Sequence, residues 1–195
     1  MSPAITSDEA VLSAARRTLD RYGWSDTTAE RIADEAGVSR VTLHRRGLTR
    51  ERILAMLAEQ ATKRYQETMW PVLTASGSGR ERLELALAVL CELAEENMAL
   101  LLALDASANA AVFHDGEEEQ LTRSVYTEPL ERMLRDGASD GTLRQVEPIE
   151  VATVLFNLVG WTYIHLRSGH RWKADRARKS TLEIALNGVT DASAI

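Results

Sequence analysis

Residues 27–53 read TTAERIADEAGVSRVTLHRRGLTRERI and decide the fold of the first part of this chain. Thr27-Thr28-Ala29-Glu30 has the spacing of a capping box, in which a hydroxyl and a glutamate satisfy the free N–H groups at a helix start. Apolar residues follow at helical spacing until Gly37, and Ser39 provides the cap for a second helix of about two turns before Gly47. Two short helices joined by a three-residue turn that contains glycine predict a helix-turn-helix.

The sequence on either side of this stretch also predicts helices. Thr6-Ser7-Asp8-Glu9 is a capping box for a helix that ends at Gly23, and Thr49 caps a longer helix from Arg50 to about Leu73. Ser78 to Glu81 is a third capping box, which opens a helix through about Leu104. Further helical segments are expected over residues 106–113, 118–135, 148–167 and 174–187. With about nine helices and no strand, the predicted fold class is all-α.

The composition describes a chain that can bury a core. Of the 195 residues, 45% are hydrophobic and 27% are charged. Cys91 is the single cysteine, which excludes an intramolecular disulfide and suits a reducing cytoplasm. The N-terminus lacks the pattern of a signal peptide, and no unbroken apolar run is longer than that from Met98 to Leu104, which is far shorter than the ~20 residues of a membrane-spanning helix. We therefore expect a soluble cytoplasmic protein.

The charges are unevenly distributed along the chain. The net charge is −6, yet residues 1–52 hold 9 Lys and Arg against 8 Asp and Glu, whereas residues 53–195 hold 14 against 21. Within the first part, one acidic residue, Glu51, stands among the arginines 40, 45, 46, 50 and 52. A small basic area on an acidic protein can hold phosphates while the remaining surface repels them.

Residues 8–57 resemble the DNA-binding head of the tetracycline-repressor (TetR) family of bacterial transcription regulators. The resemblance rests on the Thr-Thr helix start, the Ile-Ala-x-x-Ala-Gly-Val-Ser core and turn, the Thr-Leu pair in the second helix, and the basic residue that begins the next helix. It implies a helix-turn-helix DNA-binding domain over residues 1–52 and a helical ligand-binding and dimerisation domain over residues 53–195. His44, Gly47 and Leu48 depart from the family, which usually has Tyr, Phe and often Pro there. Either Leu48 fills the space of the missing ring, or the head is looser than usual.

The predicted recognition helix has a core-facing side and a side available to a DNA groove. Ile32, Ala33, Ala36, Val38 and Leu43 have the spacing to pack the two helices together. Arginine near the start of an exposed helix can read guanine in the major groove, and valine or threonine methyl groups can contact thymine. Arg40 and Arg45 are the candidate base readers, with Ser39, Val41 and Thr42 beside them. The resemblance adds Thr28, His44, Arg46 and Arg50 as phosphate contacts.

The predicted body carries candidate surfaces for a second copy and for a small molecule. Apolar residues form a stripe along each of the last two helices, and in the family these two helices pair with their copies as a four-helix bundle. The alternative is that both stripes lie inside one chain. Their residues are Val151, Val154, Leu155, Leu158, Trp161, Thr162 and His165, then Leu182, Ala185, Leu186 and Val189. Candidate lining residues for an apolar or aromatic effector are Trp70, Met98, Phe113, Tyr126, Asn157 and Trp161.

The sequence indicates a regulator rather than an enzyme. Motifs for a nucleophile elbow, a zinc protease, a P-loop or a dinucleotide fold are absent, and the histidines at 114, 165 and 170 lack the helical partners of a metal site. No cofactor or metal is expected. The predicted function is a ligand-responsive repressor that binds a palindromic operator as a dimer. The alternative is an all-helical small-molecule-binding protein or enzyme whose head has lost operator binding.

Overall fold

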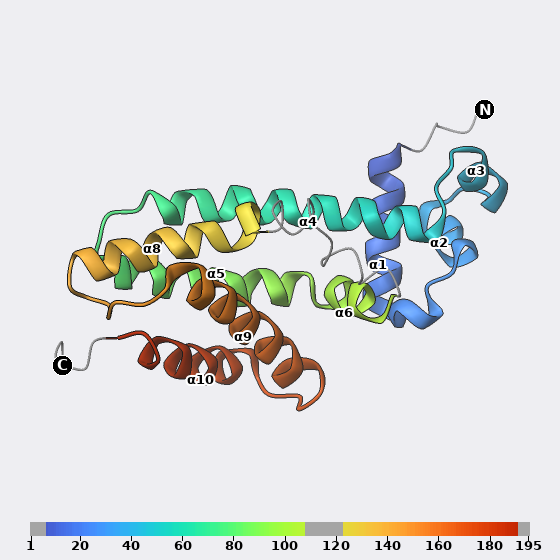
Figure 1. Cartoon of the computed structure of the whole chain (residues 1–195). Helices are drawn as coiled ribbons and strands as arrows, with labels where there is room; N and C mark the ends of the chain where they lie inside the picture. The colour runs from blue at the N-terminus through green and yellow to red at the C-terminus, as the bar shows by residue number, and fades with distance from the viewer. Residues whose placement is uncertain (1–6, 108–122, 191–195) are drawn as a thin grey trace. The chain divides into compact units, whose positions relative to one another are not determined.

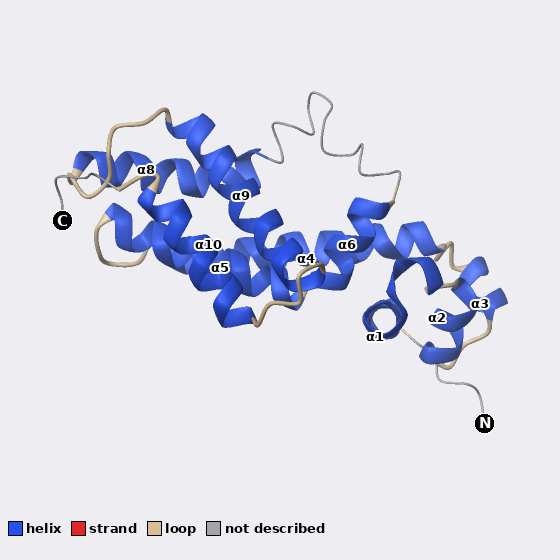
Figure 2. Cartoon of the chain, turned by 90° about the horizontal axis from the view of Figure 1, so that it is seen from below, coloured by secondary structure: helices blue, strands red, loops and turns tan. Residues whose placement is uncertain are grey.

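The computed structural model describes residues 7–107 and 123–190, and these residues form helices joined by short loops (Figures 1 and 2). They contain no strand, only an isolated antiparallel bridge between Leu143 and Thr190. The predicted all-α fold is therefore confirmed. The α-helices are α1 (Asp8–Asp26), α2 (Ala29–Ala36), α3 (Arg40–Arg45), α4 (Arg50–Leu73), α5 (Gly79–Glu96), α6 (Met98–Ala106), α8 (Glu128–Ser139), α9 (Pro148–Ser168) and α10 (Ala174–Asn187), and Arg123–Thr127 form a π-helical turn, η2.

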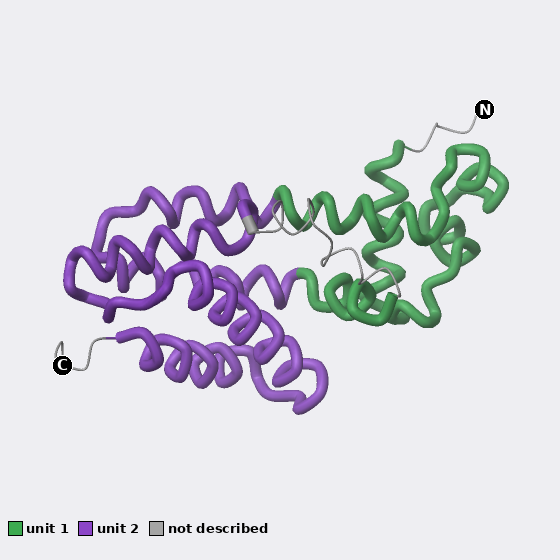
Figure 3. Tube along the Cα trace, viewed as in Figure 1, with its two compact units in different colours: residues 1–63, 97–110 green, residues 64–96, 111–195 purple. Residues whose placement is uncertain are grey.

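The chain divides into two compact units, coloured separately in Figure 3. Unit 1 comprises Met1–Lys63 and Asn97–Ala110, and unit 2 comprises Arg64–Glu96 and Ala111–Ile195. Helix α4 contributes its first part to unit 1 and its last part to unit 2. Unit 1 therefore contains a segment from the middle of the chain, α6, in addition to the N-terminal helices.

Unit 1 is organised around one apolar core. Its buried residues come from α1, α2, α3, α4 and α6, and include Val11, Leu19, Ile32, Leu43, Ile53, Leu57 and Leu100. Two helix starts differ by one residue from the expected caps. Ser7 accepts from the Ala10 N–H at the start of α1, and Thr28 accepts from the Arg31 N–H at the start of α2. The Thr27 hydroxyl instead donates to the Gly23 carbonyl and closes the end of α1.

The helix expected from Ser78 to about Leu104 is interrupted at Asn97. Helix α5 ends at Glu96, Asn97 leaves the helical conformation with φ −116° and ψ 19°, and α6 begins at Met98. The Asn97 side chain is fixed in unit 1, where its Oδ1 accepts a hydrogen bond of 2.9 Å from Arg16. No glycine or proline marks this break, which explains why periodicity alone predicted one continuous helix.

Unit 2 packs α5, α8, α9 and α10 together. Leu83, Leu87, Leu130, Met133, Val159 and Ala177 are among its fully buried side chains. The helix expected over residues 118–135 is described only from Arg123, and α8 itself runs from Glu128 to Ser139. Pro129 lies in its first turn, where the missing N–H costs no hydrogen bond.

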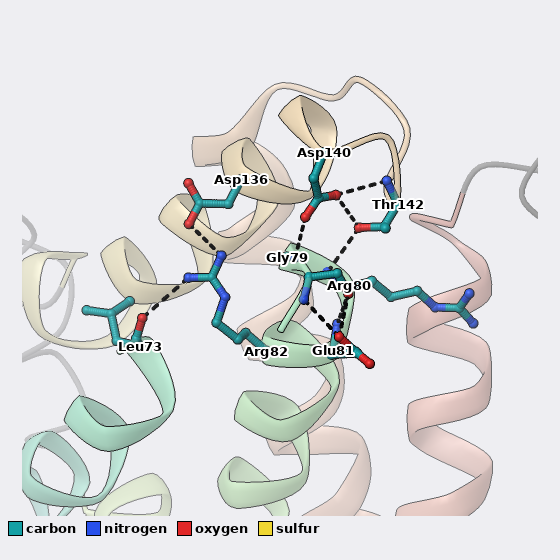
Figure 4. Close-up of polar contacts among 9 residues, drawn as sticks. Leu73, Gly79, Arg80, Glu81, Arg82, Asp136, Asp140 and Thr142 are labelled. Carbon is teal, nitrogen blue, oxygen red and sulfur yellow. Dashed lines mark hydrogen bonds and ion pairs between the residues drawn. The ribbon is translucent and has the colours of Figure 1, made fainter. Parts of the chain in front are cut away.

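The start of α5 is locked against the end of α8 (Figure 4). Asp140 accepts hydrogen bonds from the Gly79 N–H (2.7 Å) and from the Thr142 N–H (3.0 Å), while the Thr142 hydroxyl accepts from the Arg80 N–H (3.3 Å). Side chains that follow α8 therefore satisfy free N–H groups of α5. The backbones approach so closely that a Cβ on Gly79 would lie 2.1 Å from the Gly137 nitrogen.

Candidate nucleic-acid interface

The turn between α2 and α3 is held by backbone geometry and one serine. Gly37 adopts the left-handed conformation with φ +66°, and its N–H donates to the Asp34 carbonyl to close α2. Ser39 then caps α3 by accepting from the Thr42 N–H (3.1 Å). The Ser39 and Thr42 hydroxyls also share a hydrogen bond of 2.9 Å, so both side chains are fixed at the start of α3.

One face of α3 anchors the helix and the opposite face is exposed. Leu43 is 1% exposed in the core of unit 1, and Leu48, which follows Gly47 with its φ of +67°, is buried in the same core. The loop after α3 therefore contributes an aliphatic side chain, Leu48, to this core. On the outer face Arg40, His44 and Arg45 are exposed, and Val41 is 65% exposed.

The residues predicted to contact phosphates differ in the contacts that they make within unit 1. Thr28 caps α2, and Arg46 forms an ion pair with Asp8 of α1. Arg50 is turned toward Trp24, whose carbonyl accepts from its guanidinium. His44 is exposed at the surface. Thr28, Arg46 and Arg50 therefore each have a structural contact besides the DNA contact expected of them.

Glu30 lies beside the predicted base readers and was not among the expected site residues. Its Oε1 is 2.6 Å from Nη1 of Arg40, so the pair joins the first turn of α2 to the first residue of α3. A hydrogen bond from its own backbone N–H, the charge of Arg40 and the Thr28 hydroxyl hold the pKa of Glu30 below its usual range. The sequence gives no signal for this contact, because the two residues are ten positions apart and belong to different helices.

The expected effector-lining residues have different surroundings in the structure. Trp70 is 67% exposed on α4, and Asn157 is exposed on α9 with its amide bonded to the Thr153 carbonyl of its own helix. Trp161 is partly exposed on the outer side of α9. Met98 belongs to unit 1, whereas Tyr126 belongs to unit 2. Phe113 lies outside the described residues.

An aromatic cluster surrounds Tyr126 in unit 2. The Tyr126 ring centroid is 4.9 Å from that of Tyr65 and 5.4 Å from that of Phe156. The buried Tyr65 hydroxyl donates a 2.9 Å hydrogen bond to the Tyr126 carbonyl, and burial raises the Tyr65 pKa. No sequence pattern assigned a binding role to Tyr65 or Phe156.

The last two helices carry exposed apolar side chains of unit 2. Val154, Leu158 and Trp161 are 60%, 39% and 37% exposed on α9, and Ile184 is 69% exposed on α10. The stripe expected on α10 is largely internal, because Ala185, Leu186 and Val189 are buried. Helix α9 is also long and apolar enough, by length and composition alone, to cross a membrane, a test that a core helix of a soluble protein passes too.

The comparisons with known proteins agree with this geometry. Residues 11–46 match the family model of bacterial regulatory proteins, tetR family. No curated protein sequence matches the chain significantly.

Among solved structures, a TetR/AcrR-family transcriptional regulator from Thermobifida fusca is 21% identical, with a TM-score of 0.71 over 93% of this chain and 98% of that one. A putative transcriptional regulator from Saccharomonospora viridis, in complex with choline, is 21% identical, with a TM-score of 0.73 over 94% and 97%. SmeT, the repressor of the Stenotrophomonas maltophilia efflux pump SmeDEF, is 18% identical, with a TM-score of 0.70 over 98% and 94%. The helix-turn-helix is thus matched over residues 11–46 by the model of the tetR family of bacterial regulatory proteins, and the chain shares its fold with these transcriptional regulators.

Proposed function

We propose that this chain is a cytoplasmic, ligand-responsive repressor that binds a palindromic operator as a homodimer. In this proposal residues 1–52 read DNA, and residues 53–195 bind a small effector and dimerise. The observation that carries it is the outer face of α3, where Arg40, Val41, His44 and Arg45 are exposed while Leu43 anchors the helix in the core. Such a helix can enter the major groove with its N-terminal residues toward the bases.

The proposed DNA contacts divide into two chemical groups. Arg40 and Arg45 donate to guanine, with Ser39, Val41 and Thr42 at the same end of α3. Thr28, His44, Arg46 and Arg50 contact phosphates, which fix the register without reading sequence. Arg46 exchanges its contact with Asp8 for a phosphate in this proposal.

A homodimer is supported by the size of α3 and by the surface of unit 2. A single six-residue helix reaches too few base pairs to be selective, so two copies that read an inverted repeat are needed. Val154, Leu158, Trp161 and Ile184 supply exposed apolar side chains on the two C-terminal helices. Burial of these side chains against a second copy would remove them from water.

An apolar or aromatic effector is supported by the ring cluster of Tyr65, Tyr126 and Phe156. Tyr126 lies in η2, and π-helical turns often occur at functional sites. Because α4 contributes residues to both units, an effector that favours one packing of the body can act on the head through α4. A coupling of about 1–3 kcal/mol is sufficient to release an operator.

The decisive experiment is selection of bound sequences from random DNA by the purified full chain. We expect enrichment of an inverted repeat with half-sites about one helical turn apart, or a multiple of it. Failure to enrich any sequence would contradict the proposal and favour a helical binding protein or enzyme. For an effector found by thermal shift, operator DNA must weaken effector binding by the same factor by which the effector weakens operator binding.

A further inference from the structure

The ion pair between Glu30 and Arg40 is too exposed to be explained by a contribution to the stability of the fold. The Glu30 side chain is 53% exposed and the Arg40 side chain is 70% exposed. Ion pairs this exposed contribute only about 0–1 kcal/mol to stability. The pair also brings a carboxylate to the end of α3 that is proposed to meet DNA, where a negative charge repels phosphates. Electrostatic attraction to DNA alone would favour a neutral residue at position 30.

The geometry of the pair leaves one edge of the guanidinium available. Glu30 contacts Nη1 of Arg40, and no further hydrogen bond or ion pair joins Arg40 to the described residues. The remaining Nε–Nη2 edge presents two N–H donors side by side, which is the arrangement that guanine O6 and N7 accept. An arginine that is already fixed loses less conformational entropy when it binds.

We propose that Glu30 is a specificity-determining positioning residue: it holds Arg40 so that the Nε–Nη2 edge meets guanine. This inference rests on the proposed DNA-binding function and on Arg40 as a base reader. In this proposal Glu30 lowers the overall affinity for DNA, because it repels phosphates, and increases the discrimination between bases. These two effects have opposite signs, so they can be measured separately.

The test uses the operator selected by the wild-type chain and its versions with each of the four bases at the position that Arg40→Ala makes permissive. Binding is measured by fluorescence anisotropy for wild type, Glu30→Gln, Arg40→Ala and the double variant. Glu35→Gln is the matched control, because Glu35 also lies on α2 and is paired with an arginine, Arg17 of α1, at 2.7 Å. Thermal unfolding of each variant verifies that the head remains folded.

We expect Glu30→Gln to lower the preference for guanine by about tenfold, less than Arg40→Ala does. The double variant should discriminate no worse than Arg40→Ala alone, because Glu30 acts through Arg40. Glu35→Gln should leave the ratio between bases unchanged.

Three results would overturn the inference and are distinct from one another. If Glu30→Gln raises affinity for all four bases alike, Glu30 is only a surface charge. If Arg40→Ala leaves base preference intact at every position, Arg40 is not a reader, and the inference fails while operator binding stands. If the wild-type chain selects no sequence, the proposed function itself is wrong.

Discussion

The guanidinium carbon of Arg50 lies 3.6 Å from the centroid of the Trp24 ring, and the same guanidinium donates to the Trp24 carbonyl. Gly23, with φ +71°, kinks α1 just before Trp24, so the last turn of α1 is fastened to the first residue of α4. All three residues belong to unit 1. Arg50 therefore fixes the start of the helix through which an effector is proposed to act on the head.

Arg50→Ala is expected to lower the free energy of unfolding by about 1–3 kcal/mol, because it removes a partly buried cation–π contact and a hydrogen bond. It should also weaken binding to all DNA sequences alike if Arg50 contacts a phosphate. Urea unfolding and anisotropy measure the two effects. Arg52→Ala is the matched control, since Arg52 is exposed with only a 3.9 Å contact to Glu59. Equal stability of the two variants would contradict the structural role of Arg50.

Substitution of the proposed base readers should change sequence preference rather than general affinity. Arg40→Ala or Arg45→Ala is expected to cost about 1–3 kcal/mol on the selected operator and little on unrelated DNA. Loss of a phosphate contact instead reduces the slope of log affinity against log salt by about 0.9. A salt titration of each variant separates these outcomes, and full retention of sequence preference would show that the readers lie elsewhere.

The close approach of α5 and α8 predicts that Gly79 tolerates no side chain. A Cβ there would lie 2.1 Å from the Gly137 nitrogen, which is backbone and can yield only if the helices separate. We expect Gly79→Ala to destabilise the protein by about 1–3 kcal/mol in urea unfolding. Gly160→Ala in α9 is the control, since it meets no atom within 4 Å and should gain about 0.5–1 kcal/mol from helix propensity. Similar effects of both substitutions would refute the close contact.

The same α5–α8 contact predicts a contribution to acid sensitivity. Hydrogen bonds from the Thr142 hydroxyl, then from the Gly79 N–H, hold the pKa of Asp140 below its usual range. A carboxylate with a lowered pKa stabilises the fold above its unfolded pKa of about 4, and this stabilisation is lost as pH falls through the folded pKa. Asp140→Asn should therefore make the decline in unfolding free energy below about pH 4 less steep than in wild type.

Asp175→Asn provides the comparison, because the Asp175 side chain is 93% exposed. Chemical denaturation at a series of pH values measures the slopes. An Asp140→Asn variant that retains the full acid dependence would show that these hydrogen bonds do not couple to stability.

A charged residue on the exposed face of α9 should disrupt the proposed dimer. Val154→Arg places a charge on a surface that would be buried between copies, so we expect monomers at micromolar concentration. Leu85→Arg is the control, since Leu85 is 47% exposed on α5 in the same unit. Light scattering measures whether each of the two variants is a monomer or a dimer. A wild-type chain that is already monomeric would contradict the dimer, and equal dissociation of both variants would contradict the α9 interface.

The amino-acid sequence by itself determined the helices and the helix-turn-helix. Caps such as Ser39 and Thr49, stops such as Gly37, and the apolar period of each helix act over only a few residues, so they can be recognised without knowledge of the packing. The Ser78–Glu81 capping box forms as expected, with the Glu81 carboxylate 2.8 Å from the Ser78 N–H. Buried positions such as Leu43 followed from the same periodicity.

Only the tertiary structure decided what each helix face contacts. The break at Asn97 is accompanied by a hydrogen bond to Arg16, 81 positions earlier, and the cluster of Tyr65 with Tyr126 and Phe156 joins three distant segments. Periodicity identifies an apolar face, but it does not state whether that face is covered by the chain itself, which is why the sequence left both possibilities open for α10. The partner of a long polar side chain is equally undetermined by periodicity. Arg50 contacts Trp24 because of how their helices pack, and not because the two residues are neighbours in the sequence.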